Sequence, residues 1–334
     1  MKFRTLGKTG IKISEIGLGT WEISGDVYGK KDNNESIKAI HTAIELGINF
    51  IDTAAGYGKG HAEELIGKSL NQNKNLKNKI IISTKIKPKC GIFAPSPEKN
   101  IDDFYPPDYI IEQCNTSLKR LRIDQIGILF IHTWSRSWGH RTEWYETLIN
   151  LKKQGKIRSF GISIPDEGIA DANTHIEANR VDVIQCVYNV FQQEPEYTLF
   201  PLAKKHDVGI IARSPFSSGA LIGNWTKDMK FEEGDWRGIW PKSVKKNWLE
   251  EQIEMTNYVY EVIKEEDIYL SKAAIKYILM NKSVTSVIPG SANSKHVKEN
   301  TNIYKLNNLS QKTMNSLKKL WVEGKIHGTY NGSI

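Results

Sequence analysis

The chain has 334 residues, of which 39% are hydrophobic and 25% are charged, and its formal net charge is +8. This composition is typical of a globular protein rather than a disordered one, and no apolar stretch approaches the roughly 20 residues of a membrane-spanning helix. Because the lysines are scattered, we expect neither a nucleic-acid partner nor a membrane partner. The opening segment MKFRTLGKTG lacks the apolar core of a secretory signal, which makes the cytoplasm the expected location.

Residues 3–14, FRTLGKTGIKIS, predict a β-hairpin whose turn contains Gly10, a residue that adopts a positive φ at low cost. After this hairpin, short runs rich in β-branched residues alternate with amphipathic helical stretches. The runs that predict strands are SEIGLGT, NFIDT, IIISTK, QIGILFIH, SFGIS, VDVIQCVY, VGIIARS and TSVIPG. Several of the intervening segments carry apolar residues at helical spacing, namely Ile37, Ile40 and Ile44, then Ile111, Cys114, Leu118 and Leu121, then Trp144, Leu148 and Leu151.

Strands that alternate with helices predict a parallel sheet, and eight such units predict a (β/α)8 TIM barrel formed by residues 1–334 as a single domain. We expect the hairpin to close the floor of this barrel. Two insertions, residues 86–106 and 216–246, follow the third and seventh strands, so they form long loops on the rim at the carboxyl ends of the strands. Loops of this length in a compact domain usually bind or cover a ligand.

Four residues with catalytic chemistry lie at or just beyond the second, third and fourth predicted strands: Asp52, Tyr57, Lys85 and His132. In a closed parallel barrel they would converge on one rim. A carbonyl that accepts a hydride also needs a proton or a hydrogen-bond donor for its oxygen, and Tyr57 can supply the proton. A free tyrosine has a pKa of about 10, so a cation must stabilise its phenolate. Lys85 fits that role.

In this interpretation Asp52 keeps the Lys85 ammonium charged and oriented, since a lysine in an apolar environment otherwise tends to lose its proton. His132 either donates a hydrogen bond to the substrate carbonyl or shares in the proton transfer. Each residue also has an ordinary explanation: a packed tyrosine, a solvated lysine, an aspartate that caps a turn, or a core histidine. Their shared position at strand ends favours catalysis. The three cysteines have no metal-ligand spacing, so we expect no metal site.

The chain resembles the aldo-keto reductases over essentially its full length, through the segments FRTLGKTGIKISEIGLGTW, GKIRSFGIS, VIQCVYN, RSPFSSGAL and IPGS followed by KHVKEN. The resemblance implies a (β/α)8 barrel that binds NADPH without a Rossmann motif and reduces carbonyls with Tyr57, Lys85, Asp52 and His132. It also implies a set of cofactor contacts, which are Gly19, Thr20, Trp21, Asp52, Ser163, Gln185, Arg213, Ser214, Phe216, Ser218, Gly219, Leu221, Gly290, Ser291, Lys295, His296, Glu299 and Asn300.

The chain departs from the family pattern at three of the cofactor positions. Ile164 stands where members usually have Asn, Gly290 where many have Lys, and His296 where many have Arg. Ser291, Lys295 and His296 still offer an anion site at a helix start, so the resemblance favours NADPH over NADH. In the nicotinamide region, Arg213 stands where many reductases stack a tyrosine, and a guanidinium can stack on a ring as well.

The predicted substrate contacts are the rim residues Trp21, Tyr28, Tyr57, His132 and Trp134. Further aromatic residues on the long loops, Trp225, Trp236 and Trp240, either stack on a sugar or ring or pack the loops against the barrel. The sequence therefore predicts NADPH-dependent reduction of an aldehyde or ketone, with a keto-sugar as one candidate. The alternative is an NADP(H)-binding regulatory or sensor subunit resembling potassium-channel β subunits. The sequence predicts no oligomeric state.

Overall fold

The computed structural model describes all residues except 26, 30, 73–78, 94, 239–246 and 329–334. Its first element is the predicted hairpin, in which β1 (Phe3–Thr5) pairs antiparallel with β2 (Lys12–Ser14). The turn holds one 3-10 turn and ends at Gly10, whose φ is 69°. A left-handed residue at this point reverses the chain, and glycine adopts that conformation without steric cost.

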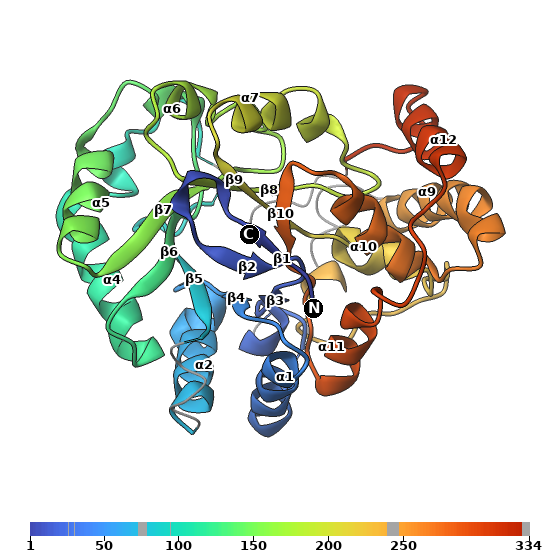
Figure 1. The fold of residues 1–334 in the computed structure, drawn as a ribbon, viewed down its shortest axis with the longest axis horizontal. Helices are drawn as coiled ribbons and strands as arrows, with labels where there is room; N and C mark the ends of the chain where they lie inside the picture. Colours follow the sequence, from blue (N-terminus) through green and yellow to red (C-terminus); the bar gives the residue numbers. More distant parts are fainter. Residues whose placement is uncertain (26, 30, 73–78, 94, 239–246, 329–334) are drawn as a thin grey trace.

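Eight parallel strands follow, each paired with the next in chain order: β3 (Leu18–Gly19), β4 (Phe50–Asp52), β5 (Ile81–Ile86), β6 (Ile126–Ile131), β7 (Ile157–Ser163), β8 (Val183–Val187), β9 (Gly209–Arg213) and β10 (Val284–Val287). Parallel bridges join Ile16 to Val287 and Gly19 to Gly290, so the last strand returns to the first. The predicted (β/α)8 barrel is therefore confirmed. In Figure 1 the helices surround these strands and the hairpin lies across the centre of the ring.

The helices lie outside the barrel and alternate with its strands (Figure 1). They are α1 (Asn33–Glu45), α2 (His61–Asn71), α4 (Pro107–Leu121), α5 (Glu143–Lys153), α6 (Asn173–Glu177), α7 (Leu199–Lys205), α9 (Trp248–Ile263), α10 (Leu270–Met280), α11 (Ser294–Thr301) and α12 (Gln311–Val322). One helical face differs from the prediction: Ile111 is 38% exposed, whereas Ile110 is buried against the barrel. In the described residues, no helix is both long and apolar enough to cross a membrane.

The interior of the barrel is layered along the strands. Apolar side chains fill the lower layers and pack beneath the hairpin, and these are Leu6, Ile11, Ile13, Phe50, Ile128, Phe130, Val183, Ile211 and Ile288. Because side chains alternate between the two faces of a strand, the residue two positions later points to the same interior. After Phe50, Phe130, Val183 and Ile211 those later residues are Asp52, His132, Gln185 and Arg213. The hairpin and the apolar layers thus form an apolar floor, and the polar side chains form the upper layer.

A cluster of aromatic rings fills the space between the barrel and the outer helices. The ring of Trp134 lies 4.9 Å from Trp144 and 4.8 Å from His175, measured between centroids. Both nitrogens of His175 are buried without a hydrogen-bond partner among the described residues. Burial lowers the pKa of His175 to about 4. This histidine is therefore neutral in the folded protein near neutral pH.

The lowered pKa of His175 predicts an acid-sensitive fold. Between pH 6.5 and 4 the unfolded chain binds a proton at this residue that the folded chain does not, so stability falls as the pH falls. From pH 7 to pH 5 the expected loss from this group is about 2 kcal/mol. Measured by urea unfolding, the free energy of unfolding of His175→Leu should not show this fall between pH 7 and pH 5. The variant His140→Gln, changed at an exposed position, should still show it. An unchanged pH dependence in His175→Leu would contradict the assignment.

Candidate active site

A buried ion pair between Asp52 and Lys85 stands at the centre of the upper layer. Asp52 is the last residue of β4 and pairs in register with Ser83 of β5, so Lys85 lies two residues further along the same face. The Nζ atom of Lys85 lies 2.6 Å from Oδ2 of Asp52, and the two side chains are 1% and 3% exposed. The predicted alternative for Asp52, a turn cap, does not describe this geometry.

Further hydrogen bonds satisfy both partners of the ion pair. Asp52 Oδ1 accepts from the Ser83 hydroxyl at 2.6 Å and from Gln185 Nε2 at 2.9 Å. Lys85 also donates to the Thr53 carbonyl at 2.9 Å. Burial lowers the pKa of Lys85, but Asp52 and then Tyr57 oppose this effect and leave that pKa above its ordinary value. The ammonium therefore stays charged although it is buried.

Tyr57 receives the third hydrogen bond of the ammonium. Lys85 Nζ lies 3.2 Å from the Tyr57 phenol oxygen and 4.9 Å from the centroid of its ring. Tyr57 begins a 3-10 segment, Tyr57–Gly60, in which Gly58 and Lys59 have φ values of 58° and 55°. These left-handed residues turn the chain sharply beyond β4. The phenol is thereby directed back over the barrel interior, while its ring stays partly exposed.

His132 lies beside this tyrosine, with 5.9 Å between the ring centroids and the rings almost perpendicular. Phe93, from the predicted insertion after the third strand, packs edge-on against the other side of the imidazole at 5.0 Å. Burial, together with the nearby Lys85 and Arg213 cations, lowers the pKa of His132 well below its ordinary value. The imidazole is therefore neutral and carries one N–H donor and one acceptor nitrogen.

A stack of aromatic rings borders the phenol on its open side. Trp21 stacks on Tyr57 at 6.1 Å and on Trp236 at 6.4 Å, and it contacts Tyr28 edge-on at 5.3 Å. The backbone of Trp236 donates to the Val27 carbonyl at 2.9 Å, and Tyr28 forms an antiparallel bridge with Asp235. The loop that follows β9 thus reaches across the rim to the loop that follows β3.

These features define a rim site with a buried cation, a phenol above it and a neutral imidazole beside the phenol. A scan against protein-family models matches the aldo/keto reductase family over residues 15–322. The chain belongs to the aldo/keto reductase family. The resemblance noted in the sequence is therefore confirmed, and with it the membership in an oxidoreductase family that binds a nicotinamide cofactor.

Named relatives of this aldo/keto reductase include two bacterial proteins. One is aldo-keto reductase YhdN of Bacillus subtilis, 32% identical over 75% of this chain and 72% of that protein. Another is the NADH-specific methylglyoxal reductase of Escherichia coli, 30% identical over 92% of this chain and 94% of that protein. A glycerol dehydrogenase structure from Gluconobacter oxydans has a similar fold, with a TM-score of 0.76, 24% identity and coverage of 100% and 97%.

The upper layer fits the nicotinamide end of the cofactor that the family implies. Gln185 donates to Asp52 through Nε2, while its Oε1 is buried without a partner among the described residues. Ser163 lies beside Gln185 in register on the neighbouring strand β7. An orphaned buried acceptor needs a donor, and a carboxamide N–H supplies one. Ile164 is buried, so its side chain cannot replace the amide that family members usually carry here.

Arg213, which was predicted to stack on the nicotinamide, has a defined anchor. Its Nη2 donates to the Ile164 carbonyl at 3.0 Å and to Asp166 Oδ1 at 2.5 Å. The guanidinium is charged and oriented by this pair at the edge of the site. Asp166 was not identified from the sequence, because its loop position carries no periodic signal.

The segment after β9 is the one that the family resemblance implies for the diphosphate of a dinucleotide. Ser217, Ser218 and Gly219 have φ values of 44°, 59° and 108°, and Ser214 has one of 55°. These left-handed residues turn the chain sharply on the rim, where the N–H groups of Ser217 and Gly219 donate to the carbonyls of Ser214 and Phe216. Arg237 lies above this segment, with Nη1 donating to the Ser218 carbonyl at 3.1 Å, and Asp235 orients the guanidinium. The predicted residues Ser214, Phe216, Ser218 and Gly219 therefore lie along one side of the rim.

The residues predicted for the adenosine end surround the start of α11. Ser291 is buried and accepts from Asn300 Nδ2 at 3.1 Å. Lys295 is 81% exposed and lies 3.9 Å from Glu299, so it is a loosely held cation. A groove of about 500 Å³ lies between the first turns of α1 and α11, and its lining includes Lys31, Lys38, Lys295 and His296 as well as Asp32 and Glu35.

The structure corrects one of the predicted contacts. Trp134 is fully buried, and its ring neighbours are Trp138, Trp144 and His175 outside the barrel, so it is not a substrate contact. The Leu221 side chain is also fully buried and belongs to the main apolar core, so the contact expected of this residue, through its backbone, stays a prediction. Of the loop tryptophans, Trp225 packs against Phe231 and Trp248, and Trp240 lies outside the described residues.

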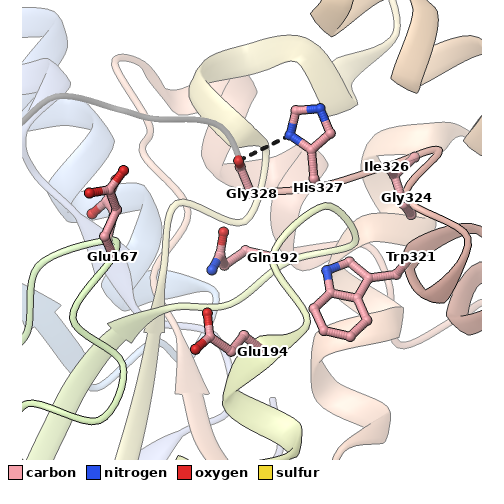
Figure 2. Close-up of a pocket in the computed structure, with 9 residues that line it drawn as sticks. Glu167, Gln192, Glu194, Trp321, Gly324, Ile326, His327 and Gly328 are labelled. Carbon is pink, nitrogen blue, oxygen red and sulfur yellow. Dashed lines mark hydrogen bonds between the residues drawn. The ribbon is translucent and has the colours of Figure 1, made fainter.

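A second hollow on the rim contains none of the four catalytic candidates. It measures about 350 Å³ and is lined by Asp166, Glu167, Gln192, Glu194, Trp321, Gly324, Ile326, His327 and Gly328. Figure 2 shows the carboxylates of Glu167 and Glu194 and the ring of Trp321 around it. It adjoins the site at Asp166, the partner of Arg213. The hollow therefore borders the catalytic rim rather than forming its centre.

The Asp52–Lys85 pair predicts a strong stability coupling. Asp52→Asn or Lys85→Met alone leaves one buried charge without its partner, which costs about 3–5 kcal/mol. The double variant leaves no unpaired charge, so its loss should be clearly smaller than the sum of the two single losses. Urea unfolding at constant pH measures the free energy of unfolding of the two single variants and the double variant. The exposed pair Lys312–Glu265, treated in the same way, should give additive and small effects. Additivity at Asp52 and Lys85 would contradict this view.

Proposed function

We propose that this chain reduces an aldehyde or ketone to the alcohol, with Tyr57 as the proton donor. The observation that supports this best is the contact between the Lys85 ammonium and the Tyr57 oxygen, at 3.2 Å, in a chain of hydrogen bonds that ends on Asp52. A cation at that distance stabilises the phenolate that remains after the proton has left. The same contact gives the lysine, the aspartate and the tyrosine one joint role.

Each residue has a defined part in the proposed reaction. When bound, a reduced nicotinamide would supply the hydride for the carbonyl carbon, and the Tyr57 hydroxyl gives its proton to the carbonyl oxygen. His132, neutral because of its lowered pKa, donates an N–H to the same oxygen. Asp52 keeps Lys85 charged throughout and does not itself transfer a proton. The phenolate then regains a proton from solvent, since the Tyr57 ring is partly exposed.

For the dinucleotide, we favour NADPH, as the sequence predicted. The basic side chains Lys31, Lys38, Lys295 and His296 line the groove beside α11 and favour a phosphate group. NADH is the second candidate, because the Escherichia coli relative is described as NADH-specific. A metal is not needed in this proposal, since the proton and the hydrogen bonds come from side chains.

The substrate we propose is a small polar carbonyl compound. The space beside Tyr57 and His132 is bordered by Trp21, Tyr28 and Phe93, whose rings restrict its width. A small hydroxylated aldehyde or ketone, including a keto-sugar, fits the mixture of rings and polar donors. The names of two relatives, a methylglyoxal reductase and a glycerol dehydrogenase, agree with this class. A cytoplasmic location remains a prediction.

The alternative function, a sensor subunit that binds the dinucleotide with little turnover, would use the same residues. Steady-state oxidation of NADPH and NADH with a panel of small aldehydes, ketones and keto-sugars distinguishes the two. Turnover of several per second with at least one compound would favour the enzyme. Dinucleotide binding without turnover on any compound would favour the sensor.

The proposed proton donor predicts a selective loss in Tyr57→Phe. The variant keeps the ring and its contact with Trp21 but lacks the hydroxyl, so kcat should fall by at least about 100-fold. The dissociation constant of the dinucleotide, measured by tryptophan fluorescence, should change by less than about threefold. Phe93→Leu, a change beside the site without proton chemistry, should alter KM more than kcat. If Tyr57→Phe retains most of its turnover, another group donates the proton.

A further inference from the structure

One acidic side chain beside the predicted cofactor groove, Glu22, has no part in the chemistry described above. Glu22 begins the 3-10 turn Glu22–Ser24, just after β3, and is partly buried. Its sequence position gives no hint of a partner. In the folded chain its carboxylate lies beside the end of β10, because the Gly19–Gly290 bridge closes the barrel at this point.

The carboxylate of Glu22 fills the space above Gly290. A Cβ atom on residue 290 would lie 2.5 Å from Glu22 Oε1 and 2.9 Å from its Cδ, so a side chain at residue 290 cannot coexist with Glu22 in this position. Many family members carry a lysine at residue 290, and in this chain the Glu22 carboxylate occupies the space that such a side chain would need. At this point the chain has the carboxylate of Glu22, from the loop after β3, rather than a cation.

The surroundings of Glu22 are those of the predicted phosphate site. The backbone N–H of Ala292 donates to its carboxylate, and the basic side chains that act on it are His296, Arg237 and Lys31. Two of these, Lys31 and His296, also line the groove between α1 and α11. Part of the positive charge that would attract a phosphate is thus already opposed by a carboxylate of the protein. Burial raises the pKa of Glu22, and the nearby basic side chains and the Ala292 N–H oppose this effect in part.

We propose that Glu22 is a specificity residue that disfavours a dinucleotide with a 2'-phosphate relative to one with a free ribose hydroxyl. The inference rests on the proposed function, since it assumes that the groove holds the adenosine end of a nicotinamide dinucleotide. A carboxylate accepts hydrogen bonds and offers none, so a ribose hydroxyl satisfies it whereas a phosphate dianion is repelled. Glu22 therefore reduces the advantage that the basic groove gives to NADPH.

Direct binding measures this discrimination without any substrate. Tryptophan fluorescence titrations at pH 8 give the dissociation constants of NADH and NADPH for the wild type, Glu22→Gln and Glu22→Ala. In both variants the dissociation constant of NADPH should fall about tenfold relative to that of NADH. Competition by adenosine 2',5'-bisphosphate and by AMP should shift in the same sense, because these compounds probe the adenosine end alone.

Glu45→Gln is the matched control, since it removes the same charge at an exposed position at the far end of α1. Its ratio of the dissociation constants of NADH and NADPH should stay within about twofold of the wild-type ratio. If both Glu22 variants also stay within that range while both dinucleotides still bind, the inference on Glu22 is wrong and the proposed reaction stands. If neither dinucleotide binds the folded wild type, the proposed function fails and the inference fails with it.

Discussion

The site depends on the buried ion pair between Lys85 and Asp52. Two charges removed from water are costly, and only close contact and further hydrogen bonds offset that cost. Here the carboxylate accepts three hydrogen bonds, and the ammonium donates to Asp52, Thr53 and Tyr57. The hydrogen bond from Gln185 comes from β8, which is not a neighbour of β4 in the sheet, and it spans the barrel interior. The pair is thus tied to the closure of the barrel.

The part of the fold and site that could be predicted follows from short-range rules. The β-branched runs predict the strands, and alternation of side chains carries Lys85 and His132 to the same interior as Asp52. The same rule could have found Ser83, two residues before Lys85, whose hydroxyl binds Asp52. Wherever a strand continues to the rim, its sequence therefore predicts which side chains meet.

The rules failed where the chain leaves a regular element. Trp134 follows His132 by two residues, but the pairing with β5 ends where the His132 N–H donates to the Ile86 carbonyl, so the alternation no longer applies and the indole turns outward. In α4 the apolar pair Ile110 and Ile111 fits a helical pattern equally well in either register, and only packing on the barrel selects Ile110. The contact of Glu22 with residue 290 depends on barrel closure between distant segments, which no local pattern encodes.

The distribution of charge explains why the histidine of the site is neutral. Lys85 and Arg213 are both cations near His132, and each already has its own carboxylate, Asp52 and Asp166. A third positive charge would be buried without a partner, so the imidazole keeps the neutral form. In the proposed reaction the negative charge that develops on the carbonyl oxygen would then meet two neutral donors, the phenol and the imidazole. Behind the phenol, Lys85 is hydrogen-bonded both to Tyr57 and to Asp52, so its charge stabilises the phenolate as the proton leaves.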